Sequence, residues 1–261
     1  MSAYEHILYE KKGHVLTVTL NRPHRLNALH PPTHRELSDA WAAYLADDDL
    51  WVAILTGAGE RAFSAGSDLK YRVDEADEKA LREPGKRPAH ILDRCFKPII
   101  AAINGYAVGG GLELAMRCDI LIAAEHAQFG LPEARRGLLA DAGGVIVLPR
   151  RLPYHTAMSL ILTGRFIDAQ EAHRIGLVSE VVPRNELMEA AERWAGEVLE
   201  CAPLSVQASK QAVLSTLDLP VAEAMGAIED LERVQRLRAS EDYVEGPRAF
   251  AEKRKPVWKG R

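Results

Sequence analysis

The sequence has few cysteines and no cysteine motif. Cys95, Cys118 and Cys201 are the three cysteines of this 261-residue chain; they are widely spaced, and no C-x-x-C pair occurs. A disulfide framework and a zinc knuckle both need closely spaced cysteines, so we expect neither of them. This usage is typical of a protein that folds in the reducing cytosol.

The sequence also lacks long apolar runs and an excess of positive charge. No apolar run approaches the roughly 18 residues that a transmembrane helix needs, and the polar first residues have no signal-peptide core. The formal net charge is −4, whereas a nucleic-acid-binding domain normally carries a basic face. We therefore expect a cytoplasmic protein that binds neither a membrane nor a nucleic acid.

Several well-known functional motifs are missing. The sequence contains no G-x-G-x-x-G after a strand-like run, no Walker A string and no G-x-S-x-G. His30 and His34 have the four-residue spacing of two ligands on one helix face, but no third ligand accompanies them. We therefore predict no metal site, and we place both histidines at the start of the first helix.

The segments that are present alternate between strand-like and helix-like patterns. Apolar runs at 99–103 and 119–124 flank a helix-like segment, which is typical of an α/β fold. Strands become scarce after residue 150, and no Gly/Ser-rich linker separates the two parts. Further strands are predicted at 14–20, 51–57, 165–167 and 177–182, and helices at 33–45, 184–201, 204–216, 221–237 and 241–253.

The most informative segment is a run of three glycines, Gly109 to Gly111, between an apolar strand and a helix-like segment that carries Glu113. Glycines allow the main chain to approach a ligand closely, and a helix start favours an anion. The segment 61–70, which contains Ser67, has a similar small-residue turn and can supply one more main-chain N–H. This arrangement suits an acid/base enzyme with an oxyanion intermediate.

Two more carboxylates follow the glycine run. Glu133 comes directly after Pro132, in the first turn of a predicted helix, and Asp141 precedes the pair Gly143-Gly144. Each feature also has a purely structural interpretation: tight packing for the glycines, a dipole complement for the glutamates, and a helix cap for Asp141. Spacing alone does not show that Glu113 and Glu133 converge.

Seven segments along the whole chain resemble, in the same order, signatures of the crotonase (enoyl-CoA hydratase/isomerase) superfamily. The segment around the glycine run and the segment around Ser67 carry most of the resemblance. The seven segments are 19–23, 27–29, 62–70, 100–115, 162–165, 169–172 and 250–254.

This resemblance implies an α/β fold of the ClpP/crotonase type. A superhelical core of ββα turns would occupy residues 1–200, and a helical oligomerisation region at 201–261 would build trimers that often pair as hexamers. The substrate would be an acyl-CoA thioester, with no separate cofactor because coenzyme A is part of the substrate. The resemblance further implies an oxyanion hole from the main-chain N–H groups of Ser67 and Gly110. It also implies Glu113 as the base that activates water and Glu133 as the donor of a proton to Cα.

The resemblance also assigns residues to the CoA part of the substrate. Phe250 and Lys253 match positions that often reach CoA from a neighbouring subunit. The basic stretch 253–255 either faces CoA phosphates or is a solvated terminus. The full set of expected CoA or substrate contacts is Arg25, Ala28, Ala65, Ser67, Asp68, Leu69, Lys70, Phe250 and Lys253.

One departure from the family pattern adds Asp141 as a third candidate catalytic residue. Typical hydratases have Pro-Gly where this chain has Ala140-Asp141. Dienoyl-CoA isomerases have a similar Ala-Asp, whose Asp moves a proton along a conjugated acyl chain. Carnitinyl-CoA dehydratases also have an Asp here, and their C-terminal string resembles residues 240–261, although they usually have Trp at the position of Ser67.

We therefore predict an acyl-CoA hydro-lyase that adds water reversibly to a trans-2-enoyl-CoA, including a carnitinyl-CoA dehydratase-like activity within that class. The alternative is a double-bond isomerase that uses Asp141 with Glu133. A more distant alternative is a non-catalytic relative that binds RNA or acts as a scaffold, and the intact glutamate pair argues against it.

Overall fold

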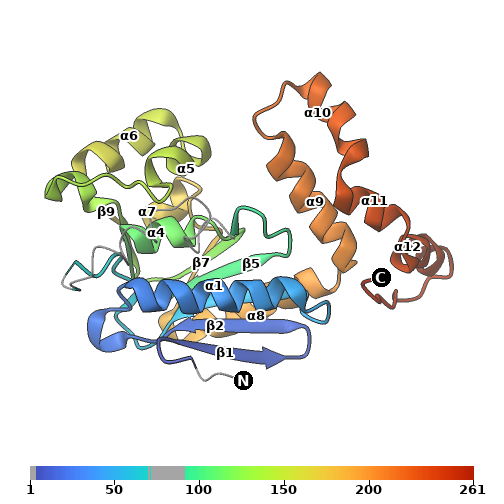
Figure 1. The fold of residues 1–261 in the computed structure, drawn as a ribbon, viewed down its shortest axis with the longest axis horizontal. Helices are drawn as coiled ribbons and strands as arrows, with labels where there is room; N and C mark the ends of the chain where they lie inside the picture. The colour runs from blue at the N-terminus through green and yellow to red at the C-terminus, as the bar shows by residue number, and fades with distance from the viewer. Residues whose placement is uncertain (1–3, 70, 72–91) are drawn as a thin grey trace.

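The computed structural model describes residues 4–69, Tyr71 and residues 92–261 (Figure 1). The main sheet has six strands in the order β1-β2-β3-β5-β7-β10. β1 and β2 are antiparallel, and all other pairs in this sheet are parallel. The strands are β1 (Ile7–Lys12), β2 (Val15–Leu20), β3 (Val52–Gly57), β5 (Ile99–Ile103), β7 (Ile120–Ala124) and β10 (Glu180–Val182).

A second sheet of four short strands lies beside the first, in the order β4-β6-β8-β9. Each of three main-sheet strands is followed by a strand of this sheet: β3 by β4, β5 by β6, and β7 by β8. In the described residues, α4 follows β6 and η2 follows β8, which gives the repeating ββα turn that we expected. The strands are β4 (Ala62–Ser64), β6 (Tyr106–Val108), β8 (Gln128–Gly130) and β9 (Phe166–Asp168).

The central strands are apolar on both faces because both faces are covered. β3 and β5 are buried at every position. Leu55 belongs to the large cluster on one face, whereas Ile54 packs on the other face with side chains of α8 (Leu187–Leu199). In Figure 1, α1 (Pro31–Ala46) and α8 lie on either side of this sheet.

The remaining elements connect and extend this core. Shorter helices follow the ends of the small strands, and the helices after residue 202 form an arm that projects away from the sheets (Figure 1). The connecting elements are η1 (Pro23–Arg25), α4 (Gly110–Ala115), η2 (Pro132–Arg136), α5 (Gly144–Arg151), α6 (Tyr154–Thr163), α7 (Ala169–Arg174) and η3 (Arg184–Glu186). The arm comprises α9 (Pro203–Thr216), α10 (Val221–Ala227), η4 (Ile228–Asp230), α11 (Glu232–Arg238) and α12 (Glu241–Ala251).

The strand predicted at 177–182 is shorter, since β10 covers only Glu180–Val182, and two helices also differ from the sequence-based prediction. The helix predicted at 221–237 is divided, because η4 follows α10 and Leu231 then adopts an extended backbone with ψ 131°. The first helix begins at Pro31 rather than near residue 33, since His30 is its N-cap. Within the described part of the chain, no helix is long and apolar enough to cross a bilayer.

Candidate active site

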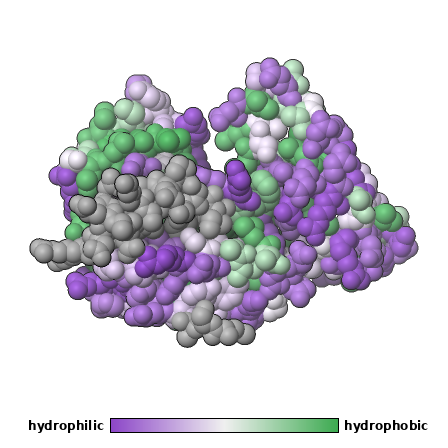
Figure 2. Space-filling model, viewed as in Figure 1, coloured by the Kyte–Doolittle hydropathy of each residue, from purple (hydrophilic) through white to green (hydrophobic). Residues whose placement is uncertain are grey.

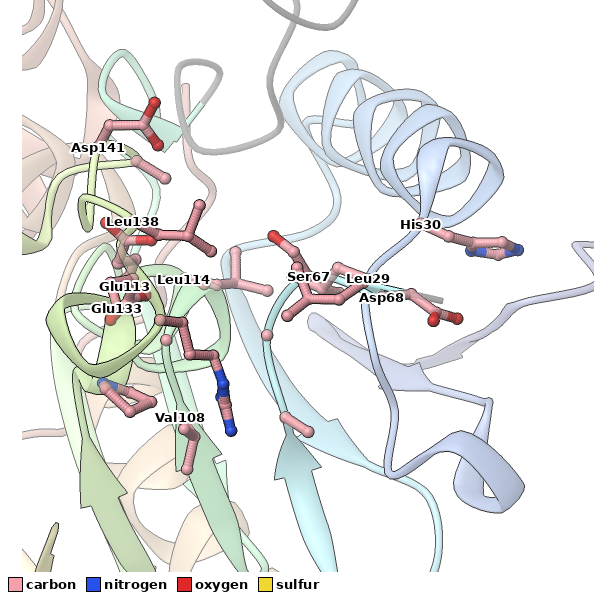
Figure 3. A pocket seen from close by; sticks show the side chains of 18 of the residues that line it. Leu29, His30, Ser67, Asp68, Val108, Glu113, Leu114, Glu133, Leu138 and Asp141 are labelled. Carbon is pink, nitrogen blue, oxygen red and sulfur yellow. The ribbon is translucent and has the colours of Figure 1, made fainter. Parts of the chain in front are cut away.

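One cavity of about 930 Å³ collects most of the predicted site residues. Ser67, Gly110, Glu113, Glu133 and Asp141 all line it. They come from the loops and turns that follow β4, β6 and β8, so the ββα repeat places them at one edge of the small sheet. Figure 3 shows the two glutamates next to each other, with Asp141 above them and Ser67 across the cavity.

The main-chain segments at Ser67 and Gly110 lie against each other. A Cβ atom built on Gly110 would be 3.6 Å from the Ser67 nitrogen. The isolated bridge between Leu29 and Ser67 uses the Gly66 carbonyl and the Asp68 N–H, so the Ser67 N–H is directed to the opposite side. Two main-chain donors therefore lie at one side of the cavity.

Gly66 and Gly109 make this close approach possible. Their φ angles are +82° and +57°, in the left-handed region that side chains disfavour. A Cβ on Gly66 would lie 2.7 Å from the Val108 carbonyl oxygen and 2.9 Å from the Gly110 nitrogen. The glycines are therefore required both for their backbone conformation and for space.

Asn27 holds the loop that precedes Ser67. Its side chain accepts a hydrogen bond from Arg22 N at 2.9 Å and donates to the carbonyls of Ala58 and Ala62 at 2.9 and 2.8 Å. Asn27 has φ +52°, a conformation that Asn tolerates better than most residues. The short segment 27–29, which carried part of the resemblance, thus fixes the loops around β4.

Arg22 and Asp68 form an ion pair beside the same loop. Their closest atoms are 3.0 Å apart, and both side chains are largely buried. The Arg22 guanidinium also donates to the Ala28 carbonyl at 2.5 Å. In Figure 3, the Asp68 carboxylate points away from the glutamates. Arg22 is thus a supporting residue that the sequence analysis missed, although it lies within the segment 19–23.

Glu113 is a buried carboxyl group with a specific hydrogen-bond donor. Its side chain belongs to α4, and the residue is only 4% exposed. Oε1 accepts a hydrogen bond from the Gly144 N–H at 2.8 Å. Burial raises the pKa of Glu113 to about 7, and the negative charges of Glu133 and Asp141 act in the same direction.

Glu133 faces the same cavity from η2. Its Oε1 is so close to Gly109 that a Cβ there would lie 2.8 Å away. Burial raises the pKa of Glu133, whereas the positive charge of Arg136 lowers it. Oε2 is buried and makes no hydrogen bond to any residue that the structure describes. The site therefore holds two carboxyl groups whose pKa values are both shifted upward.

Asp141 does not cap the helix that follows it. The N-cap of α5 is Gly143, and the side chain that accepts a hydrogen bond from the first N–H of this helix, that of Gly144, is Glu113 rather than Asp141. The structural interpretation of Asp141 as a cap is therefore wrong, because the chain reaches α5 through Gly143 with φ +123°. Asp141 instead lines the cavity and raises the pKa of both glutamates.

The other expected substrate contacts divide into two groups. Ala65, Asp68 and Leu69 line the cavity, together with Ser67. The remaining described contacts do not line it: Arg25 is exposed in η1, Ala28 is buried, and Phe250 and Lys253 are exposed in or after α12, on the arm. Lys70 lies outside the described residues.

His30 has a structural role at the start of α1. Its Nδ1 accepts a hydrogen bond from the Thr33 N–H at 3.4 Å and lies 2.6 Å from the Thr33 hydroxyl. The residue is buried, which lowers its pKa to about 4 and keeps the ring neutral. No group of three or more potential metal ligands occurs among the described residues.

Comparison with known proteins decides the family. The sequence model for enoyl-CoA hydratase/isomerase matches residues 10–261. The chain belongs to the enoyl-CoA hydratase/isomerase family, within the crotonase superfamily. Its fold is accordingly of the crotonase type, and the family is one of lyases that act on acyl-CoA thioesters.

Curated relatives and solved structures match over nearly the full chain. An (E)-benzylidenesuccinyl-CoA hydratase from Thauera aromatica is 44% identical over 97% of this chain and 99% of its own length. A carnitinyl-CoA dehydratase from Salmonella typhi is 42% identical over 96% and 97%, respectively. An enoyl-CoA hydratase structure from Bacillus anthracis has a TM-score of 0.91 at 36% identity, covering 98% of this chain and 100% of that one.

The structure also adds residues that the sequence analysis did not single out. Arg136, Leu138, Leu139, Tyr106 and Phe166 all line the cavity. Arg136 lies three residues after Glu133 on the same short helix, so its position in the chain was an available signal. Tyr106 and Phe166 are two strands apart in the small sheet, and only the pairing of β6, β8 and β9 brings their rings to 6.5 Å.

Proposed function

We propose that this protein adds water reversibly across the double bond of a trans-2-enoyl-CoA. The observation that carries this proposal is the placement of Glu113 and Glu133 on the same cavity as the main-chain N–H groups of Ser67 and Gly110. Family membership gives the acyl-CoA class of substrate. The two carboxyls give the acid/base pair that hydration requires.

The proposed reaction uses Glu113 as the base. A carboxylate with a pKa of about 7 is an effective proton acceptor near neutral pH. Glu113 takes a proton from water, the water oxygen forms a bond to Cβ, and the electron pair of the double bond moves toward the thioester carbonyl. The carbonyl oxygen of the thioester then carries the enolate charge, which the N–H groups of Ser67 and Gly110 stabilise. Glu133, whose pKa is also raised by burial, gives a proton to Cα.

No cofactor is required for these steps, because coenzyme A only carries the acyl group. We propose that the loop of Ala65, Asp68 and Leu69 contacts the thioester arm, and that Arg25 and Ala28 lie along the path to the nucleotide. Lys70 belongs to the same proposed set. The three cysteines are unpaired, which is consistent with a cytoplasmic location.

We propose that the arm of residues 201–261 mediates assembly into a trimer or a hexamer. Large apolar side chains are exposed on the arm, and more are exposed on α5 and α6 (Figure 2). A surface of this kind normally marks a protein interface. Phe250, which is 87% exposed on α12, and Lys253 would then reach CoA in a neighbouring subunit. Light scattering of the purified protein tests this assembly, and a monomer would contradict it.

Double-bond isomerisation is the second candidate function. It is favoured by Asp141, a third carboxylate on the same cavity that does not serve as a helix cap. Two relatives named above differ in the far end of their acyl groups, one being named for benzylidenesuccinyl-CoA and the other for carnitinyl-CoA. Hydration and isomerisation are distinguished by mass, because only hydration adds a water.

The test is a hydration assay with trans-2-enoyl-CoA thioesters of increasing chain length. Hydration removes the conjugated double bond, so the absorbance of the enoyl thioester should fall when the protein is added. Glu189→Gln, on the exposed face of α8, is a control that should keep the wild-type rate. A wild-type protein that hydrates none of these thioesters would overturn the proposal.

A further inference from the structure

Arg136 brings a positive charge into a cavity otherwise rich in carboxylates. Among the described residues that line the cavity it is the single arginine or lysine, and it shares the lining with Glu113, Glu133 and Asp141. The neighbouring Arg135 has a different role, because its Nε donates to the Thr163 carbonyl at 2.6 Å. The two arginines are therefore a natural pair for comparison.

The charged side chains around the cavity differ in whether they already have a partner within the chain. Asp68 is paired with Arg22, and Asp141 already takes part in an interaction within the chain. No carboxylate oxygen of a described residue lies within 4.0 Å of the Arg136 guanidinium. Its charge still lowers the pKa of Glu133 against the effect of burial, so it lies close to the acid/base pair. The guanidinium thus shares the cavity with the acid/base pair and has donors available for a ligand.

Apolar side chains next to Arg136 leave room for a short carbon chain. Leu138 and Leu139 are 51% and 64% exposed although they line the cavity. Tyr106 and Phe166 form an aromatic wall of the same cavity. Leu138 points into the cavity near the glutamates in Figure 3. An acyl chain that crosses this apolar surface would end within reach of a long, flexible arginine side chain.

We propose that Arg136 binds a carboxylate carried by the acyl group, so that the preferred substrate is the CoA monothioester of an unsaturated dicarboxylic acid. The planar guanidinium matches a carboxylate with two parallel hydrogen bonds. This inference rests on the proposed hydration, whose chemistry stays the same: the carboxylate positions the chain and takes no part in bond making. The competing role for Arg136 is that of an internal counter-ion for Glu133.

The kinetic test compares diacid thioesters with neutral thioesters of equal chain length. The probes are trans-glutaconyl-CoA against trans-2-pentenoyl-CoA, and trans-2-hexenedioyl-CoA against trans-2-hexenoyl-CoA. For the wild type, kcat/KM should favour the diacid. In Arg136→Gln this preference should fall by about tenfold to a hundredfold, mainly through KM. Arg136→Lys should keep part of it, and Arg135→Gln should keep all of it.

The outcome for the counter-ion role is different. If Arg136 only balances Glu133, Arg136→Gln should lower both members of each pair equally and move the pH profile, leaving the preference unchanged. That result would overturn the inference. A wild type that shows no preference for either diacid would overturn it too.

A binding experiment separates this inference from the proposed hydration. Saturated glutaryl-CoA and pentanoyl-CoA have no double bond to hydrate, so calorimetric titration reports recognition alone. Tighter binding of glutaryl-CoA that is lost in Arg136→Gln supports the inference even if no enoyl-CoA is hydrated. Equal affinity of both ligands, in a wild type that hydrates trans-2-pentenoyl-CoA, contradicts the inference and leaves the proposed function standing.

Discussion

The two halves of the site are built in different ways. On the Ser67–Gly110 side, the functional groups are main-chain N–H groups, and the positions that matter are glycines where a Cβ has no space. On the other side, the functional groups are the side chains of Glu113 and Glu133, placed by α4 and η2. The first half therefore depends on backbone shape, whereas the second depends on chemical identity. Substitutions should affect the two halves in opposite ways.

Conservative changes in the carboxyl half should have the largest effect on catalysis. Glu113→Gln and Glu133→Gln keep size and shape but remove a proton-transferring group, so each should lower kcat by about 10² to 10⁴-fold. Steady-state hydration of trans-2-butenoyl-CoA measures this effect, with circular dichroism to verify folding. If both variants keep the full rate, the proposed mechanism is wrong.

In the main-chain half, the side chain of Ser67 should matter little and the glycine before it should matter greatly. Gly66→Ala places a methyl group 2.7 Å from the Val108 carbonyl at a φ of +82°, which forces the two segments apart. The loss of one oxyanion donor lowers kcat by about 10² to 10³-fold. Ser67→Ala keeps the same N–H and should stay close to wild type in the same assay. Equal losses in the two variants would contradict the proposed role of the main chain.

The carboxyl half should also show a conflict between activity and stability. Glu113 has a pKa of about 7 in the folded protein against its usual value of 4.5, so the folded state holds its proton more tightly than the unfolded state. Stability contributed by this group is present below pH 4.5 and is lost as the pH rises to 7. Glu113→Gln removes this loss and should stabilise the protein at pH 8 by up to about 3 kcal/mol.

Chemical denaturation of both proteins at equal concentration measures this difference. The Gln carbonyl can still accept the hydrogen bond from Gly144, so the comparison isolates the charge. The advantage of Glu113→Gln should shrink to a small value near pH 4.5. A variant that is less stable than the wild type at pH 8 would show that burial of the ionised Glu113 carboxylate does not destabilise the folded protein.

The smallest expected effect concerns Asp141, which acts on the pair from a distance. Its negative charge raises the pKa of Glu113, so Asp141→Asn should move the acidic limb of the kcat/KM profile to lower pH by less than about one unit. A hydratase should keep most of its rate in this variant. If Asp141→Asn abolishes turnover of a dienoyl-CoA while the wild type only shifts its double bond, the isomerase alternative is favoured instead.

Local patterns in the sequence predicted most of the core. The strand predicted at 99–103 is β5, and the glycine run directly follows β6 and forms the N-cap and first two residues of α4. Apolar runs and glycines are local signals, so they can be recognised in the sequence without knowledge of the fold. The helix predicted at 221–237 is divided at Leu231, since an apolar helical pattern can cover a 3-10 turn and a single extended residue.

The convergence of the site could not be predicted from spacing. Glu113 follows β6 and Glu133 follows β8, and only the parallel pairing of these two strands brings the carboxyls to one cavity. The family resemblance, rather than the spacing, predicted that Glu113 and Glu133 act at one site. Arg136 shows the same limit, because the sequence does not reveal whether a charged residue after Glu133 lines the cavity.

The central claim is most directly tested with trans-2-butenoyl-CoA in ¹⁸O-labelled water, read by mass spectrometry. With the wild type, we predict a product that has gained one labelled water, and with the double variant Glu113→Gln/Glu133→Gln an unchanged substrate. A wild-type reaction without mass gain, or a double variant that forms the labelled product at the wild-type rate, would contradict hydration by this glutamate pair.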